Sequence, residues 1–216
     1  MNRMQKLIWL PGITLLAFML AFMLAAVQVN AGEGSAAAFR QELVAAALQR
    51  TTQQVRYDGA YQKIAYPNGD VSPDIGVCTD VVIRSYRALG IDLQQRVHED
   101  MVADFAAYPS RRIWGMTRTD TNIDHRRVPN LQAFFQRNGQ TLAVSDNPAD
   151  YQSGDLVTWM LPGNLPHIGV VSDRYAPGSK TPLIVHNIGA GPVLEDMLFR
   201  YRITGHYQYL PQRSGE

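Results

Sequence analysis

The chain begins with one long apolar run, residues 7–27, and then shows two different patterns of apolar and polar positions. Apolar residues recur at helical spacing in several stretches between residues 39 and 139. From residue 154 onward, short β-prone segments are separated by Gly, Pro, Asn and Asp. Helices that precede strands in this way predict an α+β fold, with N-terminal helices packed on a C-terminal antiparallel sheet.

Four stretches have the features of helices. Residues 39–54 are rich in helix formers and carry apolar residues on one side, which predicts an amphipathic surface helix. A second helix contains Cys78 and is expected to end before Gly90, because glycine suits the position just after a helix. The other two are predicted over residues 93–108 and 128–139.

Four strands are predicted in the last third of the chain, as an antiparallel meander. Each is short and is bounded by turn residues. Their sequences are GDLVTWML, HIGVVSD, PLIVHNIG and YRITGHYQYL. Residues 57–76 instead contain many Gly, Pro, Asn and Asp residues, and are expected to form an irregular loop with short extended pieces.

The N-terminal apolar run has the features of an export signal. Arg3 and Lys6 precede it, and the small-residue pattern that ends at Ala31 suits cleavage by signal peptidase. The run is also close to the ~20 residues that cross a bilayer. Residues 1–31 are therefore predicted to be a signal peptide or an N-terminal membrane anchor. Either way the domain is expected to be exported, and to be periplasmic or secreted, with a tether to the inner membrane if the segment is retained.

Composition and charge narrow the remaining possibilities. After the predicted signal, residues 32–38 are interpreted as a linker and residues 39–212 as one domain of ordinary size. The full chain has 20 Lys and Arg against 19 Asp and Glu; without Arg3 and Lys6 the balance is 18 against 19, a net charge of −1. A nearly balanced charge gives no electrostatic reason to expect nucleic acid as a partner.

Cys78 is the only cysteine of the chain, so it cannot form an intrachain disulfide. Its helix is expected to have Ser72 or Asp74 as the N-cap, which places Cys78 within about the first two turns. On a helical wheel Cys78 lies on the apolar side, so a small buried hydrophobic residue is one interpretation. The other is a nucleophile, since a helix N-terminus and a nearby histidine lower the pKa of a thiol.

Two histidines stand where they can assist such a thiol. His167 begins the strand HIGVVSD, and His186 lies in the next strand. Side chains alternate along a strand, so the register of the hairpin decides whether His186 or Asn187 faces His167. If residues that pair across the hairpin have numbers with an odd sum, such as 167 with 188, His186 lies on the same face as His167. A shift of the register by one residue places Asn187 on that face instead. We favour His186, because the loop length allows this register and an imidazole suits the orienting role.

Four blocks of the sequence together resemble the YijF-like family of bacterial domains of unknown function. They are VCTDVVIRSYRALG, TDTNIDHRRVPNLQAFF, GDLVTWMLPGNLPHIGVVSD and PLIVHNIGAGPVLED, and the resemblance covers about residues 40–210. That family is in turn distantly similar to the NlpC-type cell-wall peptidases of the papain-like superfamily. The resemblance implies a papain-like fold, in which a cysteine opens a helix that packs on an antiparallel sheet.

The same resemblance implies a catalytic triad of Cys78 as nucleophile, His167 as base and His186 as the orienting residue. It also implies hydrolysis of an amide bond, with peptidoglycan peptides or a related amide as the substrate. The NlpC-type cysteine usually stands in Asp-Cys-Ser-Gly, whereas here Thr79 and Asp80 follow it. The carboxylate of Asp80 is expected to raise the thiol pKa, though only weakly because it lies on the far side of the helix.

The polar block before the last predicted helix is a candidate substrate-binding segment. One interpretation is a wall of the substrate groove, with Arg126 or Arg127 paired to a substrate carboxylate. The other is a loop whose side chains bond to one another and cap the following helix. A calcium loop is excluded, because its sixth and twelfth positions would be His125 and Leu131 instead of Gly and Glu. The candidate binding residues are Asp120, Asn122, Asp124, His125 and Arg126.

The sequence thus predicts an exported cysteine hydrolase, a peptidase or amidase, that needs no cofactor. The alternatives are an acyltransferase that uses the same thiol, and a non-enzymatic periplasmic binding domain with an inert cysteine. Cys78, His167 and His186 are also a possible zinc-binding set, but their spacing carries no metal signature. The expected partner is peptidoglycan or a peptide substrate, and a membrane only through the N-terminal segment.

Overall fold

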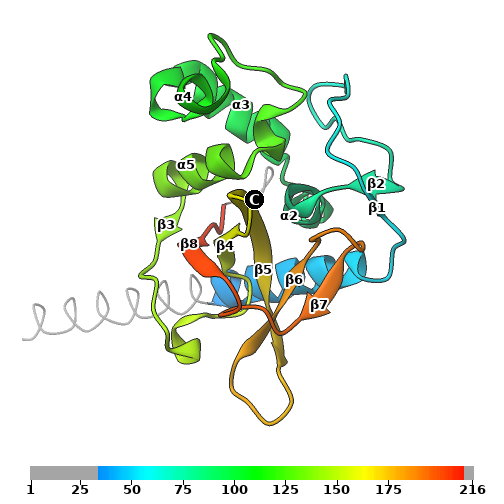
Figure 1. Cartoon of the computed structure of the whole chain (residues 1–216), viewed down its shortest axis with the longest axis vertical. Helices are drawn as coiled ribbons and strands as arrows, with labels where there is room; N and C mark the ends of the chain where they lie inside the picture. Colours follow the sequence, from blue (N-terminus) through cyan, green and yellow to red (C-terminus); the bar gives the residue numbers. More distant parts are fainter. Residues whose placement is uncertain (1–33, 212–216) are drawn as a thin grey trace, which may run out of the picture. The chain divides into compact units, whose positions relative to one another are not determined.

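The computed structural model of the chain describes residues 34–211 (Figure 1). The chain divides into two compact units, residues 1–38 and residues 39–216. Residues 34–38 are the described part of the first unit, and they are helical instead of forming the predicted linker. Three of these five residues are alanine, which has the highest helix propensity of all residues.

The predicted signal peptide or anchor over residues 1–31 lies outside the described part of the chain. Among residues 34–211, no helix has both the length and the apolar character that crossing a bilayer requires. The second unit contains every site discussed below.

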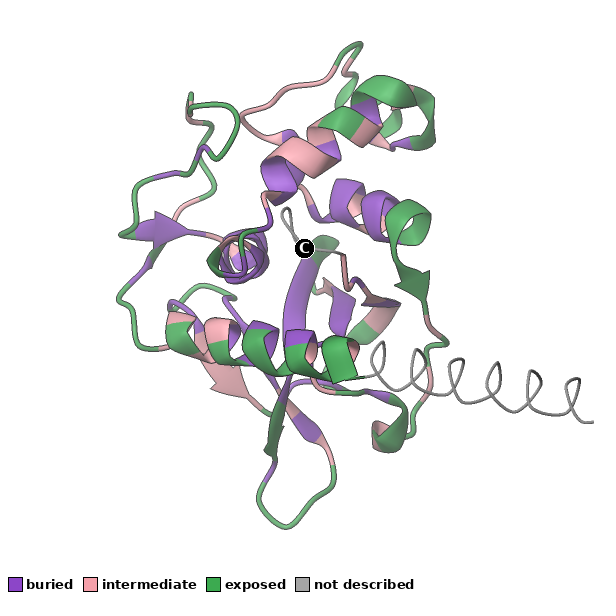
Figure 2. Cartoon of the chain, turned by 180° about the vertical axis from the view of Figure 1, so that it is seen from behind, coloured by how far each residue is buried: buried purple, intermediate pink, exposed green. Residues whose placement is uncertain are grey.

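The predicted helices are present in the second unit, and their ends differ from the predictions by a few residues. The first is helical up to residue 50, and its buried side chains recur along one side (Figure 2). The last keeps its predicted bounds, with Pro129 at its start and Gly139 after its end. The stretch predicted over residues 93–108 breaks at Asp104 into a helix and a 3-10 turn. The helical elements are α2 Cys78–Ala88, α3 Leu93–Ala103, η1 Phe105–Ala107, α4 Ser110–Trp114, η2 Asp124–Arg126, α5 Val128–Asn138 and η3 Pro148–Asp150.

Helices followed by a six-stranded antiparallel sheet confirm the predicted α+β class. The strand order is β3-β8-β4-β5-β6-β7, so β4, β5 and β6 form a meander as predicted, and β7, which was not predicted, continues it. The last strand, β8, does not continue the meander but returns to pair with β4. The mostly buried strand β4 therefore has a hydrogen-bonded neighbour on each side. A separate two-stranded sheet pairs β1 with β2. The strands are β1 Arg56–Tyr57, β2 Ile75–Gly76, β3 Gln140–Thr141, β4 Leu156–Leu161, β5 Leu165–Tyr175, β6 Pro182–His186, β7 Val193–Glu195 and β8 Arg202–Gln208.

The main sheet separates two apolar clusters. On β5, Ile168 and Val170 belong to the cluster that contains the helices, whereas Val171 belongs to a second cluster with Trp159 and Ile184. This alternation has the period of two that a strand imposes when both of its faces are buried. Fully burying an aliphatic side chain contributes about 1.5–3 kcal/mol, so Ile168 and Val170, on the face of the helices, help to hold α2 against the sheet.

α2 is almost entirely buried, with β5 and β6 on one side and α3 and η2 on the other (Figure 1). It begins at Cys78 with Val77 as the N-cap, so the predicted caps Ser72 and Asp74 are wrong. The helix cannot start earlier because strand β2 occupies the residues just before it. Asp80 supplies the capping contact instead, since its carboxylate accepts a hydrogen bond from the backbone N–H of Val77 at 2.7 Å. Cys78 is therefore the first residue of the helix.

Candidate functional site

Cys78 stands where the start of α2 meets β5, and it is only 4% exposed. The backbone N–H groups of Ile168, Thr79 and Cys78 itself lie close enough to the sulfur to favour its charged form. This edge of β5 is open to the sulfur because the pairing of β5 with β6 extends only as far as Val170. The sulfur thus lies against the backbone of the residue that follows His167.

The register of β5 and β6 brings His186, and not Asn187, to the side of His167. Val170 pairs with Val185, and the numbers of paired residues add up to an odd sum along the hairpin. The side chain of Asn187 points to the other side of the strand, where its oxygen accepts a hydrogen bond from a loop N–H. Of the two alternatives that the sequence left open, the imidazole is the one that meets His167.

The two imidazoles form a buried, hydrogen-bonded pair. Nε2 of His167 and Nδ1 of His186 are 3.1 Å apart, and the two rings are nearly perpendicular, at 89°. Burial lowers the pKa of His167 to about 3, and the neighbouring His186 adds to the decrease. Burial also lowers the pKa of His186, although Glu195 acts in the opposite direction. His167 is therefore neutral at physiological pH, with Nδ1 as the ring nitrogen that His186 does not engage.

The thiol of Cys78 is harder to ionise than the sequence predicted. Burial raises its pKa to about 12, and the charge of Asp80 adds to the increase, against the backbone hydrogen bonds that lower it. The predicted lowering by the helix N-terminus is therefore wrong, because a buried thiolate loses its hydration. Within residues 34–211, neither imidazole forms a hydrogen bond with the sulfur. The resting site holds a neutral thiol and a neutral His167.

The structure adds a carboxylate that the sequence reasoning missed. Glu195, on β7, has its Oε2 3.6 Å from Nε2 of His186 and 3.6 Å from the guanidinium of Arg200. Its side chain is 40% exposed, whereas that of His186 is fully buried. The alternation of side chains along paired strands could have identified Glu195 from the sequence. His186 pairs with Val193, so Glu195 shares the face of His186 two residues further along β7.

The predicted substrate-binding block is bonded within the domain. Asp120 accepts a hydrogen bond from the hydroxyl of Tyr61, and Asn122 donates one to the same hydroxyl. Asp124 and His125 are buried, and burial lowers the pKa of His125 to about 4. These contacts fit the interpretation of a self-bonded loop, and the substrate-binding role of the block stays a prediction.

Arg126 is paired with a carboxylate of the protein itself instead of a substrate carboxylate. Its Nε and Nη2 each lie 2.9 Å from an oxygen of Asp80, and the two side chains are 3% and 4% exposed. The carbonyl oxygen of Arg126 also accepts a hydrogen bond from the hydroxyl of Thr79. Arg127 lies over the ring of Trp114, 4.1 Å from its centre. The bidentate pair holds η2 against the first turn of α2, next to Cys78.

A zinc centre made of Cys78, His167 and His186 is not formed in the described structure. No group of three or more His, Cys, Asp or Glu side chains among residues 34–211 is placed to hold a metal ion. The two imidazoles are instead hydrogen-bonded to each other.

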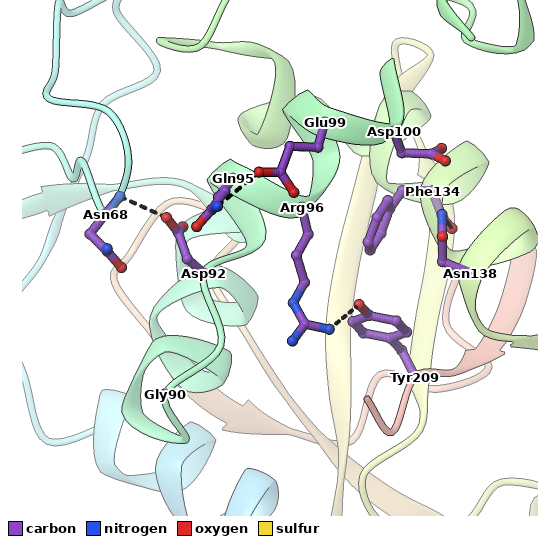
Figure 3. Close-up of a pocket in the computed structure, with 10 residues that line it drawn as sticks. All are labelled: Asn68, Gly90, Asp92, Gln95, Arg96, Glu99, Asp100, Phe134, Asn138 and Tyr209. Carbon is purple, nitrogen blue, oxygen red and sulfur yellow. Dashed lines mark hydrogen bonds between the residues drawn. The ribbon is translucent and has the colours of Figure 1, made fainter. Parts of the chain in front are cut away.

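A polar pocket of about 650 Å³ lies between α3, α5 and the C-terminal segment (Figure 3). Arg96 donates a hydrogen bond to the hydroxyl of Tyr209 across it, at 3.0 Å, and Asp92 accepts one from the backbone N–H of Asn68. Neither the cysteine nor the imidazole pair lines this pocket, so it is a second candidate site. Its lining residues are Asn68, Gly90, Asp92, Gln95, Arg96, Glu99, Asp100, Phe134, Asn138 and Tyr209.

Comparison with known proteins places the chain in a family. The model of the family described as a domain of unknown function, DUF1287, matches residues 44–209, and the chain belongs to this family. The chain is also similar to "Uncharacterized protein YijF" of Escherichia coli (strain K12), with 55% identity over 153 residues that cover 71% of this chain and 73% of that protein. The predicted YijF-like resemblance is confirmed, and the more distant similarity to NlpC-type peptidases stays a prediction.

Proposed function

We propose that this member of the DUF1287 family is a thiol-dependent hydrolase of amide bonds, with Cys78 as nucleophile, His167 as base and His186 as the orienting residue. The proposal is carried by the buried imidazole pair, with its nitrogens 3.1 Å apart, because His167 directly precedes Ile168, and the only cysteine of the chain, at the start of α2, lies near the backbone of Ile168. Buried histidines with strongly shifted pKa values cluster at catalytic sites. The order cysteine, histidine, polar residue and the helix packed on an antiparallel sheet support a papain-like, NlpC-type assignment.

In the proposed reaction the proton leaves the thiol during the attack. The pKa of Cys78 is about 12 and that of His167 about 3, so the resting site holds no thiolate–imidazolium pair. As the sulfur bonds to the amide carbonyl carbon, its proton passes to Nδ1 of His167 and the carbonyl oxygen becomes an oxyanion. The backbone N–H of Cys78 at the start of α2 is the donor for that oxyanion.

Collapse of the intermediate and attack by water complete the turnover. His167 gives its proton to the leaving amine, the C–N bond breaks, and a thioester of Cys78 remains. Water then loses a proton to His167 and attacks the thioester, the C–S bond breaks, and the sulfur recovers the proton as a carboxylic acid leaves. The predicted export of the domain makes peptidoglycan peptides the substrate we favour.

Replacement of the thiol tests the proposal. Cys78→Ala in the full chain is expected to abolish release of products from purified peptidoglycan, and His167→Gln to slow it by at least about 10²-fold, because both remove groups that take part in bond making. Mass spectrometry of the products identifies the reaction. A new carboxyl group together with a free amine indicates hydrolysis, whereas a new amide or ester indicates acyl transfer from the same thioester.

His98→Gln is the matched control, because His98 lies on α3 and does not contact the imidazole pair. It is expected to keep the activity of the unmodified chain. If Cys78→Ala keeps full activity, Cys78 is not the nucleophile and the proposal is wrong.

A second candidate function, a non-enzymatic periplasmic binding domain, is favoured by the polar pocket between α3 and α5 (Figure 3) and by the low exposure of Cys78, 4%. The rate of alkylation by iodoacetamide separates the two functions. Reaction of the folded chain at pH 7 that is slowed by His167→Gln supports the hydrolase. Reaction only after unfolding in urea supports an inert thiol and hence the binding domain.

A further inference from the structure

We infer that Glu195 is a positioning residue that fixes the tautomers of His186 and His167. The inference rests on the proposed function and extends the site from β5 and β6 to β7. Oε2 of Glu195 lies 3.6 Å from Nε2 of His186, and Nδ1 of His186 lies 3.1 Å from Nε2 of His167. Three side chains from three neighbouring strands therefore form a row that ends at His167, the residue before Ile168, whose backbone lies near the Cys78 sulfur.

The strand register is what builds this row. On β7, Val193 pairs with His186 and Glu195 pairs with Ile184, so Glu195 and His186 are diagonal neighbours on one face of the sheet. A diagonal pair of this kind is within reach of a long side chain, and glutamate has the length to span it. Shorter side chains at this position would leave a wider gap.

Nε2 of His186 is a buried nitrogen without a hydrogen-bond partner among the described residues. Such atoms are rare in folded proteins, and each calls for an explanation. At 3.6 Å the carboxylate of Glu195 is slightly too far for a hydrogen bond, and it is an acceptor that approaches an uncharged ring. Hydrogen bonds of catalytic groups are often long before substrate binds and shorten in the reacting complex.

The chemistry of the row has one consistent arrangement of protons. A carboxylate only accepts, so it favours the proton of His186 on Nε2 and leaves Nδ1 of His186 as an acceptor. That acceptor in turn favours the proton of His167 on Nε2. Nδ1 of His167 then keeps its lone pair, which is the state that a base for the Cys78 thiol needs.

Arg200 approaches the same carboxylate from the solvent side. Its Nη1 lies 3.6 Å from Oε2 of Glu195, and its side chain is 54% exposed. As a cation it keeps the carboxylate in place without offering an acceptor to His186, so it supports the same tautomer.

Nitrogen-15 NMR of the histidine rings tests the inference without any need for turnover. In the unmodified full chain we expect the proton on Nε2 of both His186 and His167. Glu195→Leu removes the acceptor, so a large share of both rings is expected to carry the proton on Nδ1 instead. In peptidoglycan turnover kcat is expected to fall at least about tenfold with KM unchanged, because a wrong tautomer disables the base.

Two further variants make the result specific. Glu195→Gln retains an acceptor oxygen and is expected to restore the Nε2 tautomers and most of the turnover. Asp196→Asn removes the neighbouring exposed charge and is expected to change neither. A proton on Nδ1 of His186 in the unmodified chain, or unchanged tautomers in Glu195→Leu, overturns the inference. If the tautomers change as expected but the unmodified chain shows no thiol-dependent turnover, the proposed function fails while the role of Glu195 stands.

Discussion

At the scale of single residues, the carboxylate of Asp80 determines much of the environment of Cys78. It accepts a hydrogen bond from the backbone N–H of Val77 and two from the guanidinium of Arg126. Burial lowers the pKa of Arg126 and the hydrogen bonds with Asp80 raise it, with a net increase that keeps the guanidinium charged. One side chain thus caps α2, compensates a buried cation and makes the thiol harder to ionise.

Removal of one partner of this pair is expected to be costly. Asp80→Asn should lower the free energy of unfolding by about 3–5 kcal/mol, because it leaves the Arg126 charge buried without compensation. Urea unfolding of the full chain measures the loss. The double variant Asp80→Asn with Arg126→Met removes both charges and should recover part of it. Single losses that simply add up in the double variant would show that the two side chains are not coupled.

At the scale of the elements, β5 and β6 approach each other closely because residue 169 is glycine. A Cβ at Gly169 would lie 2.6 Å from Cγ2 of Ile184, 2.9 Å from the carbonyl oxygen of Val185 and 3.2 Å from Cβ of His186. The backbone of Gly169 is not among those with a positive φ, so the requirement is for space and not for an unusual conformation. The absence of a side chain here lets β6 present His186 to the ring of His167.

Gly169→Ala is therefore expected to force the two strands apart. The added methyl group should cost about 1–3 kcal/mol of stability through overpacking, and should lengthen the contact between the imidazoles. Urea unfolding measures the first effect and ring NMR the second. Gly59→Ala is the control, since its Cβ would make an ordinary contact of 3.5 Å with Val77. Equal stability of the two variants would contradict the steric argument.

At the scale of the whole molecule, packing keeps several histidines uncharged. Burial lowers the pKa of His125 to about 4 and that of His167 to about 3, and it also lowers the pKa of His186. In an unfolded chain each ring has a pKa of about 6.5. Below that pH the unfolded chain takes up protons that the folded chain does not, so folding becomes less favourable as the pH falls. Above it both states are neutral, and these rings contribute no pH dependence.

The free energy of unfolding is accordingly expected to decrease between about pH 6.5 and pH 4.5, by up to about 1.4 kcal/mol per pH unit for each buried histidine. Urea unfolding of the full chain over a pH series measures the slope. His125→Gln should reduce the number of protons taken up on unfolding by about one, which makes the slope shallower, and should leave the contact between His167 and His186 unchanged. A curve that stays flat down to pH 5 would contradict the lowered pKa values.

The sequence by itself determined the features that depend on local periodicity. The arrangement of helices before strands, the helix that carries Cys78 near its start, and the strands that contain His167 and His186 all follow from the spacing of apolar residues and from turn residues, whereas α4, β3 and β7 were not predicted. The parity of the strands also limited the partner of His167 to two residues, because side chains alternate strictly along a strand.

Only the tertiary structure decided which of those possibilities is realised. The pairing of Val170 with Val185 selected His186 over Asn187, and the β6–β7 hairpin brought Glu195 to the same row. Burial in the assembled domain raised the pKa of the Cys78 thiol against the effect of the helix start. Register and desolvation arise from contacts between residues far apart in the chain, so a local pattern of residues does not contain them.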